Sequence, residues 1–280
     1  MRKSEKQQIV AYFFLSAAAL VTVLILGLII FYVLSRGLSM ISVEFLTAHP
    51  RRMGSEGGIF PAIIGTIYLV AATMAIATPI GVGAAIYLNE YTREGPLTNT
   101  IRFFTEVLAG IPSIVFGLFG FVFFVIILQP ITGGWSILSG ALTGVTMILP
   151  TVVRASEEAL KAVPNTLREG SLALGTTRWQ TIKRVVLPTA FPGILTGLIL
   201  SIGRVIGETA AFILTIGGTL LIPHSIFDGT RTLALHLYMV AMETGAMDVA
   251  FGVAAVLIFL VITINATSAF LLRRFMKKVS

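Results

Sequence analysis

The sequence predicts an all-α polytopic membrane protein with six transmembrane helices and both termini in the cytoplasm. Hydrophobic residues fill 56% of the 280 positions and charged residues only 12%, whereas soluble domains carry about 25% charged residues. The apolar residues form six long runs, and about 20 residues suffice to cross the hydrocarbon core. Fifteen of the 20 Lys and Arg residues fall on one side of this topology, which places that side in the cytoplasm.

The composition also excludes several classes of site. The chain has no cysteine, so it can form no disulfide, thiol nucleophile or thiolate metal site. Its three histidines show no metal-binding spacing, and we expect no metal and no cofactor. The net charge of +7 is compatible with nucleic acid or anionic lipid. Its distribution favours cytoplasmic retention of basic loops, so we expect a lipid environment and no nucleic-acid partner.

The first span follows a basic cytoplasmic tail, residues 1–8. The apolar run from about Ile9 to Leu34 is too long for a signal-peptide core of about 7–15 residues, and no cleavage site of small residues is evident. We therefore interpret it as a spanning helix. A polar loop over Arg36–Ile59 separates it from the second span.

Pro79 and Pro112 lie inside the second and third predicted spans. The second covers about Phe60–Leu88 and contains Pro79, the third covers about Ile101–Leu128 and contains Pro112, and the fourth covers Trp135–Val153. A proline inside a span removes a backbone hydrogen bond that neighbouring protein or water must replace. Packing kinks and pore-lining breaks both fit this pattern.

The fifth span is predicted over about Phe191–Ile216 and the sixth over Val249–Leu272. A polar loop, Gly217–Met247, lies between them, and a basic cytoplasmic tail follows at 273–280. The chain is thus expected to be one permease domain over residues 9–272 with two short tails. Glycine pairs such as Gly193 and Gly197 suit close helix packing.

The longest polar interruption, Glu157–Pro188, separates the fourth and fifth spans. Thr166 and Glu169 have the spacing of a capping box, which predicts a helix from about Leu167. Gly175 then supplies a helix stop, because glycine adopts the left-handed conformation without a Cβ clash.

A second helix is predicted in the same loop. Thr177 and Gln180 again have the spacing of a capping box, and Pro188 is expected to limit this helix at its far end. A loop that only connects two spans can be much shorter. The pattern of helix, glycine bend and helix therefore indicates a surface that another protein grips.

Charges within or near the spans mark a second candidate site. Arg204 and Glu208 are four residues apart in the fifth span, so on a helix they would share a face and pair. A charge at bilayer depth costs about 2.5–3.5 kcal/mol on insertion scales, so such residues face protein or water. Arg204 would line an anion pathway, or the pair would be a purely structural contact. Glu106 and Arg102 have the same spacing at the cytoplasmic end of the third span, where an interfacial pair is expected.

The sequence lacks the motifs of catalysis. It contains no phosphate-binding G-x-x-x-x-G-K-[ST] loop and no nucleophile elbow or kinase motif. Asp228 and Glu243, in the outer loop, fit solvated charges better than a catalytic dyad. We expect no enzyme activity in this chain.

The loop carries a recognisable pattern. Glu169-Gly170-Ser171, three residues, Gly175, nine residues and then Val185–Pro188 resembles the EAA loop of ABC importer permeases. The family motif has Ala-Ala where this chain has Gly-Ser, and Ile where it has Val185. The resemblance implies a type I importer permease whose loop docks on a separate ATPase. The implied contact residues are Glu169, Gly170, Ser171, Gly175, Trp179, Leu187 and Pro188.

Apolar Leu172 and Leu174 are further candidates for the ATPase contact, because docking needs apolar anchors. For Trp179, packing against the membrane helices of its own chain is an equal alternative.

A narrower resemblance covers nearly the whole chain. The stretch Gly203–Thr209, together with Ile111–Ser113 and Leu149–Thr151, is similar to the phosphate importer permeases of the PstA type. This implies pairing with a sister permease, PstC, two copies of the ATPase PstB, and an external phosphate-binding protein, PstS. It also implies a pathway role for Arg204, Glu208 and Thr209. A permease for another oxyanion, or the PstC type itself, is the alternative.

Two rivals come from other classes. An ATP-independent secondary transporter or channel would not need the 157–188 loop. An intramembrane enzyme would need clustered catalytic residues at membrane depth, and only Arg204 and Glu208 are clearly there. Copurification with an ATPase separates the permease from both.

Overall fold

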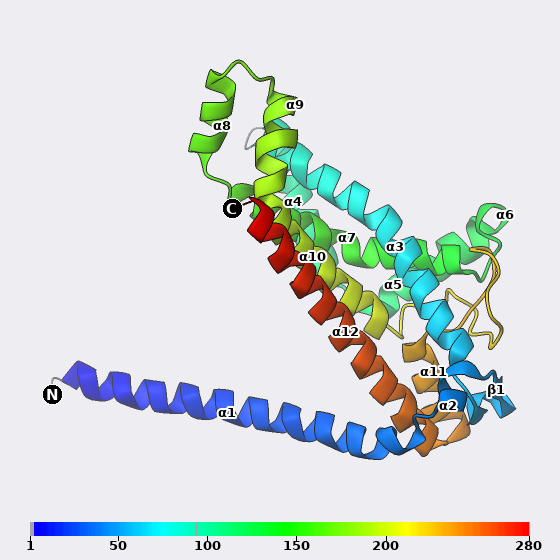
Figure 1. Cartoon of the computed structure of the whole chain (residues 1–280). Helices are drawn as coiled ribbons and strands as arrows, with labels where there is room; N and C mark the ends of the chain where they lie inside the picture. Colours follow the sequence, from blue (N-terminus) through cyan, green and yellow to red (C-terminus); the bar gives the residue numbers. More distant parts are fainter. Residues whose placement is uncertain (1–2, 93–94, 280) are drawn as a thin grey trace.

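The computed structural model describes residues 3–92 and 95–279, and most of the described chain is helical (Figure 1). Its longest helices are α1 (Lys3–Gly37), α3 (Phe60–Ile86), α7 (Ile137–Lys161), α10 (Leu187–Gly207) and α12 (Met247–Val279). Shorter α-helices are α2 (Val43–Thr47), α4 (Pro96–Ala109), α5 (Ser113–Gly120), α6 (Gln129–Thr132), α8 (Asn165–Ala173), α9 (Arg178–Thr181) and α11 (Leu233–Met239).

Tighter or wider turns and one small hairpin complete the described elements. The 3-10 turns are η1 (Leu38–Met40) and η2 (Arg52–Gly54), and the π-helical segments are η3 (Tyr87–Tyr91), η4 (Phe121–Ile127), η5 (Ile182–Val186) and η6 (Val240–Thr244). Strands β1 (Pro50–Arg51) and β2 (Glu56–Gly57) pair antiparallel, with Pro50 opposite Gly57.

In the described chain, five helical stretches are long and apolar enough to cross a membrane, and a bent pair makes a sixth if it counts as one span. This agrees with the predicted six. The third span, however, is not one helix. The chain bends by 101° between its two halves, Thr98–Ala109 and Ser113–Ile127. Pro112 causes the break, because it disfavours helical backbone at the residue before it, and its own ψ is 140°.

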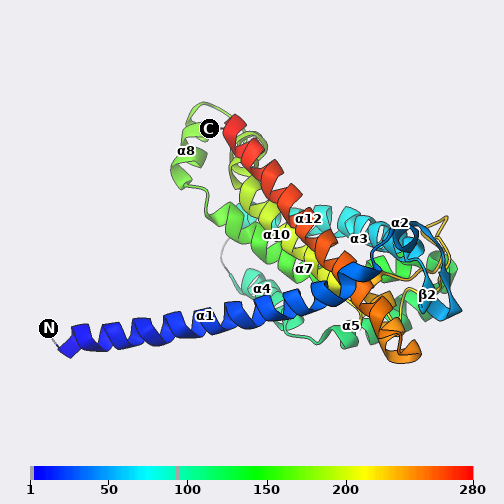
Figure 2. The same ribbon diagram turned by 60° about the horizontal axis from the view of Figure 1, so that its bottom comes forward.

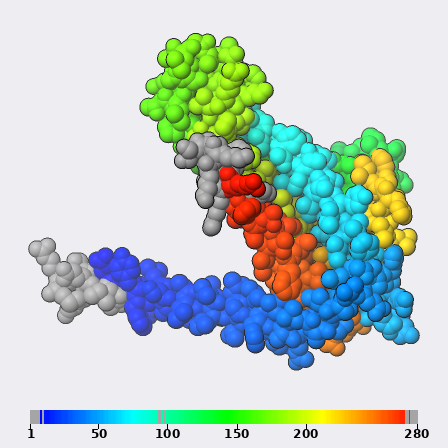
Figure 3. Space-filling model, viewed as in Figure 1, coloured from blue at the N-terminus to red at the C-terminus, as the bar shows by residue number. Residues whose placement is uncertain are grey.

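The first span projects from the rest of the molecule. Its candidate membrane segment, Ala11–Met40, has none of its most apolar window buried within this chain, and Figures 1, 2 and 3 show α1 leaving the body as a separate arm. Its end is anchored to α12, where Tyr32 packs edge-on against Phe251, with ring centroids 5.6 Å apart. The arm's apolar sides are therefore free for lipid or another subunit.

Helices α3, α7 and α10 form the centre of the body. Leu69, Ile148 and Val205, one from each helix, belong to one buried apolar cluster. Small residues permit this approach: a Cβ on Gly193 would lie 2.6 Å from the Cβ of Ala159, and one on Gly197 would collide with Ala155. The prediction of close packing at these two glycines is confirmed.

The fifth span differs from its predicted limits. One continuous helical stretch runs from Arg178 to Gly207, so it begins before Pro188 and ends before Ile216. Pro188 does not end the second helix of the loop, because it lies in the first turn of α10 directly after the π-helical η5. Thr189 donates its hydroxyl to the Val185 carbonyl, 2.7 Å away, and so partners a carbonyl of the widened turn.

The polar loop predicted over Gly217–Met247 is largely structured. It contains α11, whose first four residues, Leu233–His236, are buried. Thr232 caps this helix by accepting a hydrogen bond from the Leu235 amide, 3.2 Å away. This segment, α2 and the hairpin lie at the end of the molecule opposite α8 and α9 (Figure 1). We call this end the outer end.

Candidate functional site

Helices α8 and α9 and the turn between them, residues 165–181, protrude from the body, and we call them the handle (Figures 1 and 3). The predicted bend is present: Gly175 has φ = +82°, the left-handed conformation. The capping box of α9 is also confirmed. Gln180 donates its amide to the Thr177 hydroxyl at 3.3 Å, and the Thr177 amide donates to the Gln180 side chain at 2.9 Å.

The first predicted capping box does not form. Helix α8 begins at Asn165 after Pro164, and no side chain caps it. The Leu167 amide instead donates to the Pro164 carbonyl at 3.2 Å. Thr166 is thus already inside the helix and cannot act as the cap residue. The helix starts two residues earlier than predicted, directly after Pro164, a residue that helices tolerate at their start but not in their interior.

The far end of the handle is apolar and open. Leu174 is 86% exposed, Trp179 54% and Leu172 47%. Glu169 and Gly170 are exposed beside them, and nothing lies within 4 Å of a Cβ built on Gly170. Trp179 is not packed into its own chain, so the packing alternative is not what the structure shows. An exposed group of large apolar side chains is typical of a protein contact surface.

Hydroxyl contacts join the two arms of the handle. The Ser171 hydroxyl lies 2.8 Å from that of Thr176 and 3.0 Å from that of Thr181, and Thr176 also donates to the Ser171 carbonyl at 2.7 Å. At the handle's base, Leu187 packs on the buried cluster that contains Val186. The two arms are therefore held together by side-chain hydrogen bonds in addition to the covalent turn between them.

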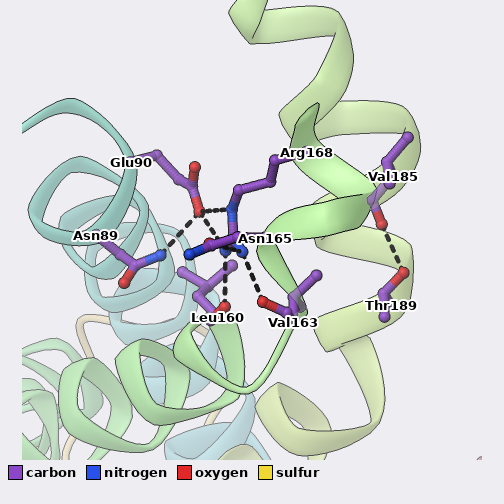
Figure 4. A network of polar contacts seen from close by, with 8 residues as sticks. All are labelled: Asn89, Glu90, Leu160, Val163, Asn165, Arg168, Val185 and Thr189. Carbon is purple, nitrogen blue, oxygen red and sulfur yellow. Dashed lines mark hydrogen bonds and ion pairs between the residues drawn. The ribbon is translucent and has the colours of Figure 1, made fainter. Parts of the chain in front are cut away.

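Arg168 fixes the handle to the membrane body (Figure 4). Its guanidinium donates to Oε1 of Glu90 at 2.8 and 3.2 Å, to the Val163 and Leu160 carbonyls at 2.6 and 2.9 Å, and to Asn165 Oδ1 at 3.2 Å. Sequence analysis missed this pair, because 78 residues separate the partners and no local spacing marks them.

Ion pairs at the ends of α4 and α7 also differ from expectation. Arg102 pairs with Glu157, 2.6 Å apart, and Lys161 reaches the same carboxylate at 3.0 Å. Glu106 instead lies 3.5 Å from Arg154. The predicted Arg102–Glu106 pair is therefore wrong. Glu157, a buried residue of the neighbouring helix α7, binds Arg102 in place of Glu106.

The predicted pathway residues lie where α10 ends. The helix ends at Gly207 and Glu208 is extended, with φ = −78° and ψ = 129°. The predicted Arg204–Glu208 pair is therefore absent, because the two residues no longer share a helix face. Glu208 accepts a hydrogen bond from the Ala211 amide at 3.2 Å instead, and the Thr209 carbonyl accepts from Ile213 at 2.9 Å.

Arg204, Glu208 and Thr209 are all half-buried. Within residues 3–92 and 95–279, no carboxylate lies within ion-pair distance of Arg204. A half-buried guanidinium without a counter-ion offers a fork of N–H donors that suits a tetrahedral oxyanion.

The outer end contains a buried basic pair that the sequence did not indicate. Burial, together with the smaller effect of the Arg231 charge, lowers the pKa of His236 to about 4. Burial also lowers the pKa of Arg231, against the opposing effect of Glu243. Neither ring nitrogen of His236 has a hydrogen-bond partner among the described residues. Asp228, by contrast, accepts from the backbone amides of His224 and Ser225 and so organises the loop.

Comparison with known proteins assigns the family. Residues 77–280 match the family described as the inner membrane component of binding-protein-dependent transport systems. The chain belongs to this family. It is therefore a multi-pass membrane permease, a subunit that works with a separate ATPase and a binding protein and is not itself an enzyme.

Individual relatives agree with this assignment. The permease is 37% identical over 280 residues to the probable ABC transporter permease protein YqgI of Bacillus subtilis, covering 94% of each chain. It is 38% identical over 216 residues to the phosphate transport system permease protein PstA 1 of Mycobacterium tuberculosis, covering 76% of this chain and 70% of the relative. A chain of the bacterial alginate ABC transporter shares its fold, with a TM-score of 0.71, 16% identity and 98% of each chain covered.

Proposed function

We propose that this permease forms part of the phosphate pathway of an ATP-driven importer and that the handle couples it to the ATPase. The handle, with its apolar exposed end, supplies a docking surface. Arg204 supplies a candidate anion ligand at the opposite end of the continuous helix that starts in the handle. The observation that carries the proposal is this connection by a single helix between a docking surface and an unpaired arginine.

Phosphate is supported by two independent lines. Several relatives between 32% and 38% identical are named as PstA permeases of phosphate transport systems. Arg204 is half-buried and has no carboxylate partner in the described chain. Glu208 then organises the segment after α10 through the Ala211 amide, and Thr209 lies beside it as a hydroxyl donor.

The proposed ATPase contact uses the residues that the resemblance implied. Leu172, Leu174 and Trp179 would enter a cleft of the ATPase as apolar anchors. Glu169, Gly170 and Ser171 would line the same contact, while Gly175, Leu187 and Pro188 set the bend and the base of the handle. By the same proposal the partners are the sister permease PstC, two copies of PstB, and PstS at the outer end.

The sister permease also accounts for α1. A 30-residue apolar arm that its own chain leaves uncovered can pack against a second permease and lipid. We place the assembly in the bacterial plasma membrane with both termini and the handle in the cytoplasm, which the distribution of basic residues favours. The end of α12 and the handle lie at the same end of the molecule (Figures 1 and 2). Tails at 1–8 and 273–280 would then flank a permease domain at 9–272.

The test is reconstitution of the four-component assembly in vesicles, with uptake and ATP hydrolysis measured for phosphate, sulfate and molybdate. We expect ATP-dependent uptake of phosphate above the other two anions. Arg204→Gln should abolish uptake while the ATPase still copurifies, and Arg51→Gln, at an exposed outer position, should not. Wild-type uptake by Arg204→Gln would refute the role of Arg204, preference for another anion would refute phosphate, and full-rate uptake without nucleotide would refute the ATP-driven importer.

A further inference from the structure

Both arms of the handle contact η3, the π-helical end of α3. From α8, Arg168 donates two hydrogen bonds to the Glu90 carboxylate. From α9, the Arg178 guanidinium lies over the ring of Tyr91, 5.5 Å from its centroid. The handle is thus attached to α3 by side chains at two points, although α3 is not its neighbour in the chain.

The Glu90–Arg168 contact is strengthened by its burial. The side chains of Glu90 and Arg168 are only 7% and 16% exposed, and a buried apolar cluster that includes Ala85 and Val163 lies at the same place. Asn89 donates a further hydrogen bond to the same carboxylate oxygen at 2.8 Å. Ion pairs with little solvent exposure are screened far less than surface pairs.

An ion pair nearby provides the contrast. Arg154 and Glu106, on α7 and α4, lie 3.5 Å apart, but their side chains are 62% and 60% exposed. Exposed pairs of this kind contribute little, because solvent screens them and their side chains lose entropy. Charge alone therefore does not distinguish the Glu90–Arg168 contact. Burial and multiple hydrogen bonds do.

We infer that the Glu90–Arg168 pair is a mechanical joint through which the handle moves α3, as a second route beside α10. The inference rests on the proposed function of the handle as the ATPase contact. Both residues are positioning residues, since neither touches a transported anion. The joint makes η3 and α8 move together when the ATPase moves the handle.

The route continues to the region of Arg204 through packing. On α3, the Thr73 side chain lies 3.0 Å from a Cβ built on Gly144 of α7, and the Phe212 ring lies 3.4 Å from the same point. Leu69 of α3 belongs to one buried cluster with Phe212 and Ile216, from the segment that follows Glu208. A displacement of α3 therefore reaches this segment through packed side chains.

The absence of cysteine from the chain permits a direct test of the joint by spin labelling. Labels are placed at Thr166→Cys on α8 and Tyr87→Cys on η3, both exposed positions, in the full assembly. In the otherwise unmutated chain we expect the same distance with and without trapped ATP. With Arg168→Ala added, the distance should shift or broaden on ATP binding. A nucleotide-dependent distance with Arg168 intact, or an unchanged one in Arg168→Ala, would overturn the inference.

Coupling supplies a second readout, the number of phosphate ions taken up per ATP hydrolysed. We expect Arg168→Ala and Glu90→Gln to lower this ratio by about tenfold or more, with the ATPase still bound and hydrolysing ATP. Arg168→Lys should recover part of the ratio, because it keeps the charge but not the bidentate fork. The double variant Glu90→Gln/Arg168→Gln leaves no unpaired buried charge, so it should assemble, and its loss should equal that of either single change.

The exposed pair is the matched control, and Glu106→Gln should keep the wild-type ratio. Additive losses in the double variant, or a normal ratio in an assembled Arg168→Ala complex, would overturn the joint. Failure of the proposed function has a different signature, because the wild-type assembly itself would then show no ATP-dependent uptake. The two outcomes are distinguished before any variant is made.

Discussion

Replacing Gly175 by valine should uncouple ATP hydrolysis from uptake. The residue has φ = +82°, and nothing lies within 4 Å of a Cβ built on it. A side chain at this position therefore meets no neighbour, and its cost is that of the backbone conformation alone. For an L-residue the left-handed region costs roughly 1–2 kcal/mol, and a β-branched residue is a stronger outlier there.

A cost of about 2 kcal/mol changes the ratio of bent to unbent handle by about 30-fold. The hydroxyl contacts of Ser171 with Thr176 and Thr181 join the arms only in the bent form, so in the unbent form the ATPase would engage a surface with its arms at the wrong angle. Gly175→Asn should be milder, because asparagine tolerates this conformation. Uptake should fall in the order glycine, asparagine, alanine, valine, while ATP hydrolysis persists.

Gly170 provides the matched control in the same handle. It too has open space around a built Cβ, but it lies inside α8 and its φ is not positive. Alanine there should stabilise the helix by about 1 kcal/mol, and the EAA motif itself has alanine at this position of the proposed contact. Gly170→Ala should therefore keep coupled uptake. The assay is phosphate uptake and ATP hydrolysis in the same vesicles. Normal coupling in Gly175→Val would show that the bend angle is not what transmits the motion.

Two further predictions concern the body. Gly197→Val should destabilise the permease by about 1–3 kcal/mol, because its Cβ would collide with Ala155. Thermal unfolding in detergent measures this loss. An equal loss in Gly203→Ala, where a Cβ has open space around it, would contradict the packing argument. Acidification should destabilise the outer end between about pH 6.5 and 4. The pKa of His236 is lowered to about 4 in the folded chain, so the unfolded chain binds the proton first as the pH falls. About 3 kcal/mol of folding stability is lost across that window. The assay is hydrogen exchange of the α11 amides as a function of pH. His236→Gln should remove the pH dependence, whereas His224→Gln, at an exposed site, should keep it. Exchange that does not change with pH in the wild type would refute the prediction.

The sequence predicted best what depends on short spacings. Thr177 and Gln180 are three residues apart, and their capping box forms because both partners belong to one helical turn. The left-handed bend at Gly175 was predictable because glycine, which lacks a Cβ, adopts this conformation at little cost, whereas few other residues do. The six apolar runs predict the spans for a similar reason, since length and composition alone decide whether a helix suits the hydrocarbon core.

The failures arise where tertiary contacts outweigh a local rule. Arg102 and Glu106 have the spacing of a helical pair, yet Arg102 binds Glu157, 55 residues away and more deeply buried. Arg204 and Glu208 have the same spacing, but the helix ends between them at Gly207. The Glu90–Arg168 contact has no local signal at all. A single sequence gives no means of matching partners across such distances.

The error at Pro188 bears most directly on mechanism. A helix ending there would have separated the handle from the fifth span by a flexible link. Instead η5 accommodates the proline within a stretch of 30 residues, Arg178–Gly207, which spans about 45 Å at about 1.5 Å per residue. The hydrocarbon core is only about 30 Å thick, so the helix extends beyond it at the handle end. Under the proposed function, movement applied to α9 passes along this helix to Arg204, three residues from its other end, and the helix can flex at the wider turn of η5 and at Pro192 inside α10. The proposed joint at Glu90 would limit how far the turn of η5 can flex, since it holds the handle to α3.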